Sequence, residues 1–130
     1  MSDERAIREL VEKWASAVRA KDRAAILRHH SADILMFDVP PPLQSKGIDA
    51  YDKTWDLFYS GSPDPVAFEI REMNVSAGKD AAFVAALMRC ETRMPNGGYG
   101  PLDFRLTIGL RKIDNQWTVM HEHHSVPAID

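Results

Sequence analysis

The front of the chain carries apolar residues at a helical period. One face of a helix over residues 3–20 would collect Ile7, Leu10, Val11, Trp14 and Val18. Ser2 or Asp3 is placed to cap the first free amide groups of this helix. Asp22 offers a second cap, so we expect another short helix over residues 22–30.

A short apolar run, ILMFD at residues 34–38, is typical of a first strand. Prolines at positions 40–42 end it, because proline lacks the amide hydrogen that strand pairing needs. A third helix is expected over residues 47–60, where one helical face collects Ile48, Tyr51, Trp55 and Phe58. The segment SGSPDP that follows is a strong signal for the end of this helix.

After this helix the apolar pattern changes to a period of two, which indicates β-strands. The expected strands cover residues 66–75, 81–93, 103–113 and 117–126. Helices at the front and strands mostly at the back predict an α+β fold with a curved, mainly antiparallel sheet. The helices are expected to cover one face of that sheet. No repeat or linker interrupts the pattern, so we expect one domain over residues 1–130.

The last hairpin can be placed in register from its turn. Asp114 and Asn115 tolerate positive φ, and a two-residue turn there sets Ile113 opposite Gln116. Because side chains alternate along a strand, the segment HEHHS at residues 121–125 should then divide between two faces. The side chains predicted to face the core are His121, His123 and Ser125. Those predicted to face outward are Glu122 and His124, with Glu122 in reach of Arg105.

Composition narrows the classes of function. A formal net charge of −3 argues against a nucleic-acid-binding surface, which usually needs a basic patch. The chain has no apolar run of roughly eighteen residues, and its start lacks a basic stretch followed by an apolar one. Cys90 is the only cysteine, which excludes an internal disulfide. We therefore expect a cytoplasmic protein with no membrane partner and no nucleic-acid partner.

Two histidines set into an apolar face need hydrogen-bond partners or a cavity. They can be structural core histidines or groups that exchange protons with a ligand. A metal site is a third reading, because His-x-His on a strand supplies two ligands, but zinc takes three or four. Asp38 could approach in space, yet the spacing specifies no third ligand. P-loop, Rossmann and zinc-finger patterns are absent from the sequence, and we expect no metal and no cofactor.

The two front helices, the segment ILMFDVPPPLQSKGIDAY and the closing LRKIDNQWTVMHEHHSVP resemble the SnoaL-like proteins. These belong to the nuclear transport factor 2-like superfamily, together with ketosteroid isomerase. The closing Trp-x-Val-x-His-x-His-x-Ser-x-Pro pattern also resembles the association domain of calcium/calmodulin-dependent kinase. The resemblance covers essentially the whole chain. It implies a cone-shaped α+β barrel, in which a strongly curved sheet and the N-terminal helices enclose a pocket.

The resemblance also implies a pocket aspartate that acts as a general base, and Asp38 is the closest match. On this hypothesis Asp38 abstracts a proton from a small, mostly apolar carbonyl compound or activates water, as in an isomerase, cyclase or hydrolase. His121 or His123 would stabilise the developing oxyanion. Burial in an apolar cone favours such a base, because it disfavours the charged carboxylate. The alternative for Asp38 is a structural role, capping the turn over residues 39–43.

Further residues are expected to contact the ligand, although aromatic side chains on helices often belong to the core. They are Trp14, Tyr51, Trp55, Tyr99 and Ser125. The alternative function is a non-catalytic module for ligand binding or dimerisation, similar to the kinase association domain. A stress-related protein without pocket chemistry is a third possibility.

The outer face of the last hairpin is polar but carries few charges, with Thr107, Thr118 and Met120 at its centre. It lacks the charge density of a solvated sheet surface. Members of the resembled family typically pair through this face. We therefore expect a twofold homodimer through the outer face of the sheet.

Overall fold

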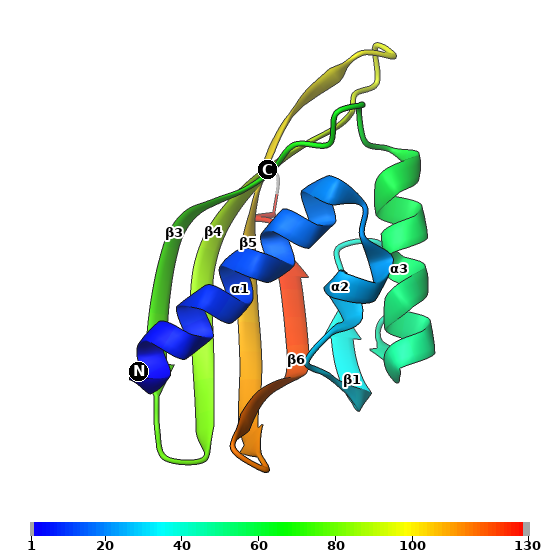
Figure 1. Cartoon of the computed structure of the whole chain (residues 1–130). Coiled ribbons are helices and arrows are strands. Elements are labelled where there is room, and N and C mark those ends of the chain that lie inside the picture. Colours follow the sequence, from blue (N-terminus) through cyan, green and yellow to red (C-terminus); the bar gives the residue numbers. More distant parts are fainter. Residues whose placement is uncertain (1, 129–130) are drawn as a thin grey trace.

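The computed structural model describes residues 2–128 and places all helices on one face of a single six-stranded sheet (Figure 1). The elements in chain order are α1 (Asp3–Ala20), α2 (Arg23–Leu27), β1 (His30–Phe37), β2 (Ser45–Lys46), α3 (Ile48–Ser60), β3 (Phe68–Ala77), β4 (Ala81–Arg93), β5 (Tyr99–Ile113) and β6 (Gln116–Ser125). The α+β fold expected from the sequence is confirmed, and its helices come close to the expected ranges.

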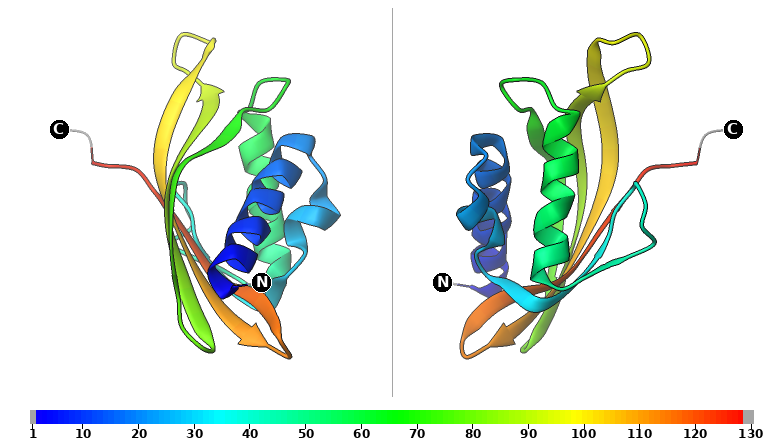
Figure 2. Two further views of the ribbon diagram at one scale, coloured as in Figure 1. Left: turned by 60° about the vertical axis from the view of Figure 1, so that its left-hand side comes forward. Right: turned by 90° about the vertical axis from the view of Figure 1, so that its right-hand side faces the viewer.

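The sheet has the order β2-β1-β6-β5-β4-β3 and is not closed. Strand β1 runs parallel to β6, and all other neighbouring strands are antiparallel. Figure 2 shows that the sheet bends around the helices and that the β4–β5 hairpin extends beyond them. The result is a cone whose wide end lies near this hairpin and the last turn of α3.

The largest deviation from the expected elements lies between α2 and β1. The second helix ends at Leu27, because Arg28 takes an extended conformation with ψ of 138°, and His29 then takes a left-handed φ of 61°. The first strand therefore begins at His30, four residues before the apolar run that predicted it. This places the imidazole of His30 inside the fold, where the sequence pattern expected helix.

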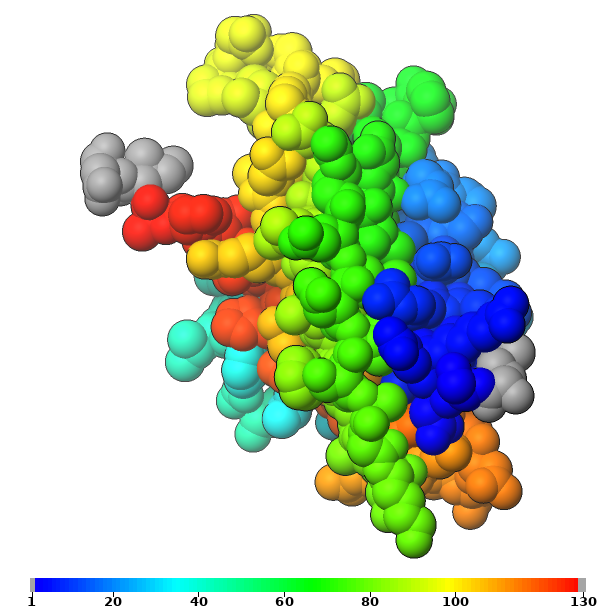
Figure 3. All heavy atoms as spheres, turned by 90° about the vertical axis from the view of Figure 1, so that its left-hand side faces the viewer, coloured from blue at the N-terminus to red at the C-terminus, as the bar shows by residue number. Residues whose placement is uncertain are grey.

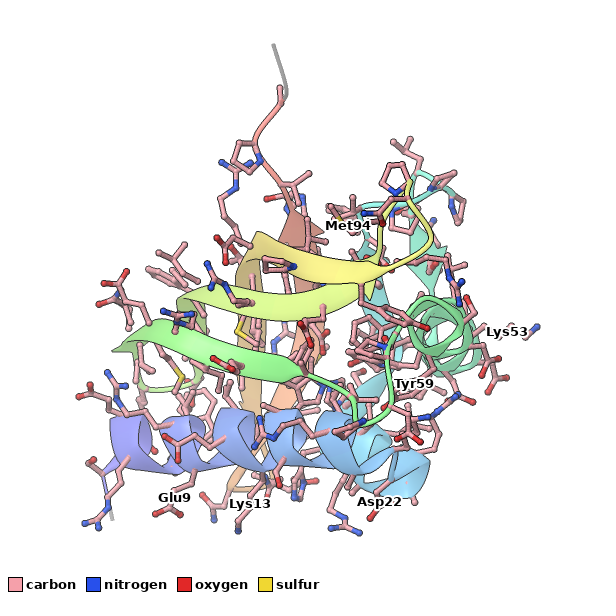
Figure 4. All side chains as sticks on the ribbon, turned by 90° about the horizontal axis from the view of Figure 1, so that it is seen from above. Glu9, Lys13, Asp22, Lys53, Tyr59 and Met94 are labelled. Atoms are coloured by element: carbon pink, nitrogen blue, oxygen red, sulfur yellow. The ribbon has the colours of Figure 1, made fainter. Side chains whose placement is uncertain are left out.

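Helix α1 packs on the sheet through its apolar face, while Glu9 and Lys13 point away from it (Figure 4). The Ser2 hydroxyl caps the helix by accepting the amide of Arg5 at 3.2 Å, as expected. Figure 4 also shows Tyr59 on the side of α3 that faces α1, where its hydroxyl donates to the Val18 carbonyl at 2.7 Å. The helices are thus tied to each other as well as to the sheet.

Strand β3 forms a free edge of the sheet, and α1 runs beside it (Figure 3). Two arginines of α1 reach across to this edge. Arg8 donates to the carbonyl of Met73 at 3.1 Å, and Arg19 donates to the carbonyl of Phe68 at 2.7 Å. These bonds satisfy edge acceptors that would otherwise be open to another strand. Within residues 2–128, no helix is long and apolar enough to cross a membrane.

The β5–β6 hairpin begins in the expected register and then departs from it. Asp114 and Asn115 form the turn with φ of 49° and 64°, and Ile113 pairs with Gln116. Leu110 still pairs with Val119, but the next pair is Gly109 with His121, so Met120 is an extra residue in β6. A β-bulge of this kind moves every later side chain to the opposite face.

The predicted orientation of the histidine-rich segment is therefore wrong. His123 is exposed, His121 is half-buried, and Glu122 and His124 are buried. Ser125 lies on the outer face, where its hydroxyl accepts a hydrogen bond from Arg105 at 3.1 Å. The expected approach of Glu122 to Arg105 does not occur, because the bulge turns the carboxylate into the core.

Candidate functional site

A cavity of about 360 Å³ lies at the wide end of the cone. Its wall combines the end of β1, the C-terminal half of α3 and the inner face of β3, β4, β5 and β6. The lining is mostly apolar and consists of Met36, Asp38, Val39, Pro40, Thr54, Trp55, Leu57, Phe58, Ser60, Gly61, Phe68, Cys90, Thr92, Leu102, Phe104 and His124. This volume falls in the range of pockets that bind small molecules.

Asp38 is in the wall of this cavity, directly after β1. One of its carboxylate oxygens, Oδ1, accepts the amide hydrogen of Val39 at 2.8 Å, and Pro40 follows immediately. This hydrogen bond and the fixed φ of proline restrict the carboxylate. The other oxygen, Oδ2, has no hydrogen bond to a described residue.

The second ionisable group of the wall is His124, which the sequence predicted to face outward. Its ring stacks on Phe104, with centroids 5.6 Å apart and planes at 20°. Its Nε2 lies 3.2 Å from Oε1 of Glu122. Because of the bulge at Met120, His124 lines the cavity instead of His121 and His123, which were expected there.

Glu122 is fully buried and is the centre of a polar network behind the cavity. Its Oε2 lies 2.7 Å from Nε2 of His30 and accepts the Tyr51 hydroxyl at 2.7 Å. The Trp14 indole in turn donates to the Tyr51 oxygen at 3.1 Å. The carboxylate therefore has partners on both oxygens, as a buried charge requires.

The network fixes the charge of its carboxylate. Burial by itself would raise the pKa of Glu122, but the hydrogen bonds from His124 and His30, together with the positive charge of His30, outweigh it and lower that pKa from 4.5 to about 2. Burial and the neighbouring Glu122 charge raise the pKa of Tyr51 well above 10. Glu122 is thus an anion at neutral pH, and Tyr51 stays a hydrogen-bond donor.

Cys90 is the third ionisable residue in the cavity wall. Burial, followed by the nearby negative charges of Asp103 and Glu91, raises the pKa of its thiol to about 11. The thiol is therefore neutral at physiological pH and is a weak nucleophile. Cys90 contributes apolar surface to the wall, as expected for a small buried residue.

The residues predicted from the sequence to form the site are only partly brought together. Asp38 and Trp55 share the cavity wall, whereas Trp14 and Tyr51 lie deeper, in the Glu122 network. The remaining four lie outside the wall: Tyr99 on the exposed β4–β5 hairpin, and His121, His123 and Ser125 on β6 beyond the bulge.

His121 and His123 instead flank Phe37 of β1, with ring centroids 4.7 Å and 5.4 Å from it. Nδ1 of His121 is 2.7 Å from the Leu35 carbonyl, which fixes that ring. Among residues 2–128, no group of three or more histidine, cysteine or acidic side chains is arranged to hold a metal ion.

Sequence reasoning missed the network of Glu122, His30 and His124. A signal for the bulge was present, because Gly109 interrupts an otherwise β-favouring strand and such glycines often mark bulges. His30 gave no such signal, since it lies 92 residues before its partner Glu122.

Comparisons with known proteins agree with this architecture. Residues 7–129 match the model of the SnoaL-like domain. Curated proteins include none that matches the chain. Among solved structures, a nuclear transport factor 2-like protein of unknown function from Pseudomonas putida KT2440 is 36% identical, with a TM-score of 0.83. That similarity covers 95% of this chain and 86% of the other.

Two more distant structures share the fold. A ketosteroid isomerase-like protein from Erwinia carotovora atroseptica SCRI1043 is 18% identical, with a TM-score of 0.79 and 98% of each chain covered. The association domain of the C. elegans calcium/calmodulin-dependent kinase is 22% identical, with a TM-score of 0.72 and 92% of each chain covered. The chain belongs to the SnoaL-like domain family, within the nuclear transport factor 2-like superfamily.

Proposed function

We propose that this protein binds a small, mostly apolar molecule in the cavity at the wide end of the cone, and that Asp38 exchanges a proton with it. The observation that carries the proposal is the position of Asp38 in a wall that is otherwise mostly apolar. A carboxylate that is held in place beside a bound carbonyl compound is suited to abstract a proton next to the carbonyl group. The reaction would be of the isomerase, cyclase or hydrolase type.

The chemistry is tested with an enolisable bicyclic ketone, 2-tetralone, as the probe. Exchange of its acidic hydrogens for deuterium in D2O is followed by NMR at neutral pH, with and without the protein. Asp38→Asn keeps the shape of the side chain but removes the base, so exchange should fall by about 10²- to 10⁴-fold. Asp33→Asn is the matched control, since Asp33 is an exposed aspartate of β1 outside the cavity wall.

The second candidate is a binding module without catalysis. It is supported by the hydrogen bond from the Val39 amide to Asp38, which is also what a purely structural cap would form. Saturable binding of the ketone without exchange, or equal exchange by the protein and by Asp38→Asn, would favour this module over the enzyme.

We also propose a homodimer through the outer face of the sheet, and a cytoplasmic location that is supported by the single cysteine. Thr107 is exposed on this face, and two large apolar side chains of β4 lie there too. Phe83 is 53% exposed and Leu87 is 48% exposed. This face also carries the charged side chains of Arg89, Asp103 and Arg105, and the large exposed apolar side chains among them favour a protein interface.

A further inference from the structure

The hydrogen-bond partners in the buried Glu122 network determine which nitrogen atoms carry a proton. Nδ1 of His30 is 2.9 Å from the Arg28 carbonyl, and its Nε2 is 2.7 Å from Oε2 of Glu122. A carbonyl oxygen and an ionised carboxylate can only accept hydrogen bonds. Both nitrogens of His30 must therefore carry a proton, and the resulting imidazolium neutralises the charge of Glu122.

This pairing determines which nitrogen of His124 is protonated. Because Oε1 of Glu122 only accepts, the proton of His124 must sit on Nε2, which faces it at 3.2 Å. His30 already supplies the counter-charge, so a second buried cation at His124 would be unbalanced within the network. His124 is thus neutral, and its Nδ1 keeps a free lone pair that has no partner among the described residues.

An unused donor lies behind the cavity wall. The indole N–H of Trp55 is buried and has no hydrogen-bond partner of good geometry within the described part of the chain. Trp55 and His124 share the wall, with ring centroids 6.4 Å apart. Because the Trp55 nitrogen is fully buried, a ligand hydroxyl in the cavity can reach His124 but not this donor.

The charge of the cavity wall also favours a neutral ligand that can donate a hydrogen bond. Asp38 supplies the only carboxyl group of the described lining, which includes no lysine or arginine. A ligand carboxylate would enter an apolar cavity with a negative charge nearby and no cation to pair with, which is costly. A neutral ligand with a hydrogen to donate meets no such penalty.

We propose that His124, held in one tautomer by Glu122, is a hydrogen-bond acceptor in the cavity wall and favours neutral, mostly apolar molecules that carry a hydroxyl or N–H group. This inference rests on the proposed ligand-binding function of the same cavity. It assigns the Glu122–His30 pair a positioning role that acts through His124.

Three probes that share one bicyclic core test whether the cavity prefers a hydrogen-bond donor, a neutral molecule without a donor, or an anion. 2-Naphthol donates a hydrogen bond, 2-methoxynaphthalene has lost the donor, and 2-naphthoate is an anion. Titration calorimetry should show 2-naphthol binding about tenfold more tightly than 2-methoxynaphthalene, as expected for one buried hydrogen bond, with 2-naphthoate the weakest. His124→Phe keeps an aromatic ring on Phe104 but should reduce this preference to about one. His123→Phe, the same change at an exposed histidine of β6 outside the cavity wall, should retain it.

An independent measurement needs no variant and no ligand. Long-range ¹H–¹⁵N correlation spectra at neutral pH should show His124 protonated on Nε2 alone and His30 protonated on both nitrogens. A proton on Nδ1 of His124 would overturn the assignment. Equal binding of all three probes, or tightest binding of 2-naphthoate, would overturn the selectivity but leave the proposed ligand-binding cavity standing. Binding of none of them would overturn both.

Discussion

Replacing Glu122 by glutamine tests the buried ion pair directly. The amide keeps the size of the side chain but leaves the His30 imidazolium without its counter-charge. The pKa of Glu122 lies at about 2 in the folded protein against an ordinary 4.5. At about 1.4 kcal/mol per pH unit, this lowering corresponds to about 3 kcal/mol of folding stability. Removing one partner of a buried pair costs a similar amount, about 3–5 kcal/mol.

The lowered pKa of Glu122 also predicts how the stability difference between the wild type and the variant changes with pH. A carboxylate whose pKa is lowered on folding stabilises the protein above its unfolded pKa of 4.5, and this stability is lost as the pH falls toward about 2. Glu122→Gln lacks this contribution at every pH. The stability deficit of the variant should therefore be about 3 kcal/mol near pH 6, should shrink to about 1 kcal/mol near pH 2.5, and should vanish only at lower pH.

Urea unfolding followed by tryptophan fluorescence measures both quantities, since Trp14 and Trp55 are buried beside the network. Glu72→Gln is the control, because Glu72 is exposed, and should change stability by less than about 0.5 kcal/mol. A deficit for Glu122→Gln below about 1 kcal/mol near pH 6, or one that stays constant down to pH 3, would refute the ion-pair reasoning.

Two further predictions concern the turn and the outer face. Asn115→Val should lower the free energy of unfolding by about 1–2 kcal/mol, because a β-branched residue at a φ of 64° is strained; an unchanged urea midpoint would contradict the turn geometry. For the proposed dimer, sedimentation should show two chains for the wild type and one chain for the double variant Phe83→Glu, Leu87→Glu, since two buried carboxylates would be unpaired. Lys13→Glu, on the outer face of α1, should remain a dimer; a wild-type monomer at micromolar concentration would rule the interface out.

Most of the fold followed from local patterns. The helical face of residues 3–20, the period of two after residue 66 and the Asp114–Asn115 turn each depend on neighbouring residues, and each is found as expected. Strand β2 was missed, because two residues carry no period. The parallel pairing of β1 with β6 was not anticipated either, since it joins segments far apart in the sequence.

The site was less predictable, because one inserted residue decides which histidine enters the cone. The alternation rule was correct as far as Val119 and failed at Met120, where the bulge begins. A bulge depends on the bend that the whole sheet needs to wrap its helices, and a local pattern of apolar residues does not encode that bend. Asp38 could be placed near the cavity through the resemblance to SnoaL-like proteins, whereas the pairing of His30 with Glu122 is purely tertiary.

The central claim, that the cavity at the wide end of the cone is a ligand site, is tested most directly by ¹H–¹⁵N spectra of the backbone during titration with 2-naphthol. The largest shift changes should fall on cavity residues such as Cys90 and Phe104, saturate together, and leave Phe83 on the outer face unchanged. Changes confined to the outer face, or no saturable change up to the solubility limit of the probe, would contradict the account.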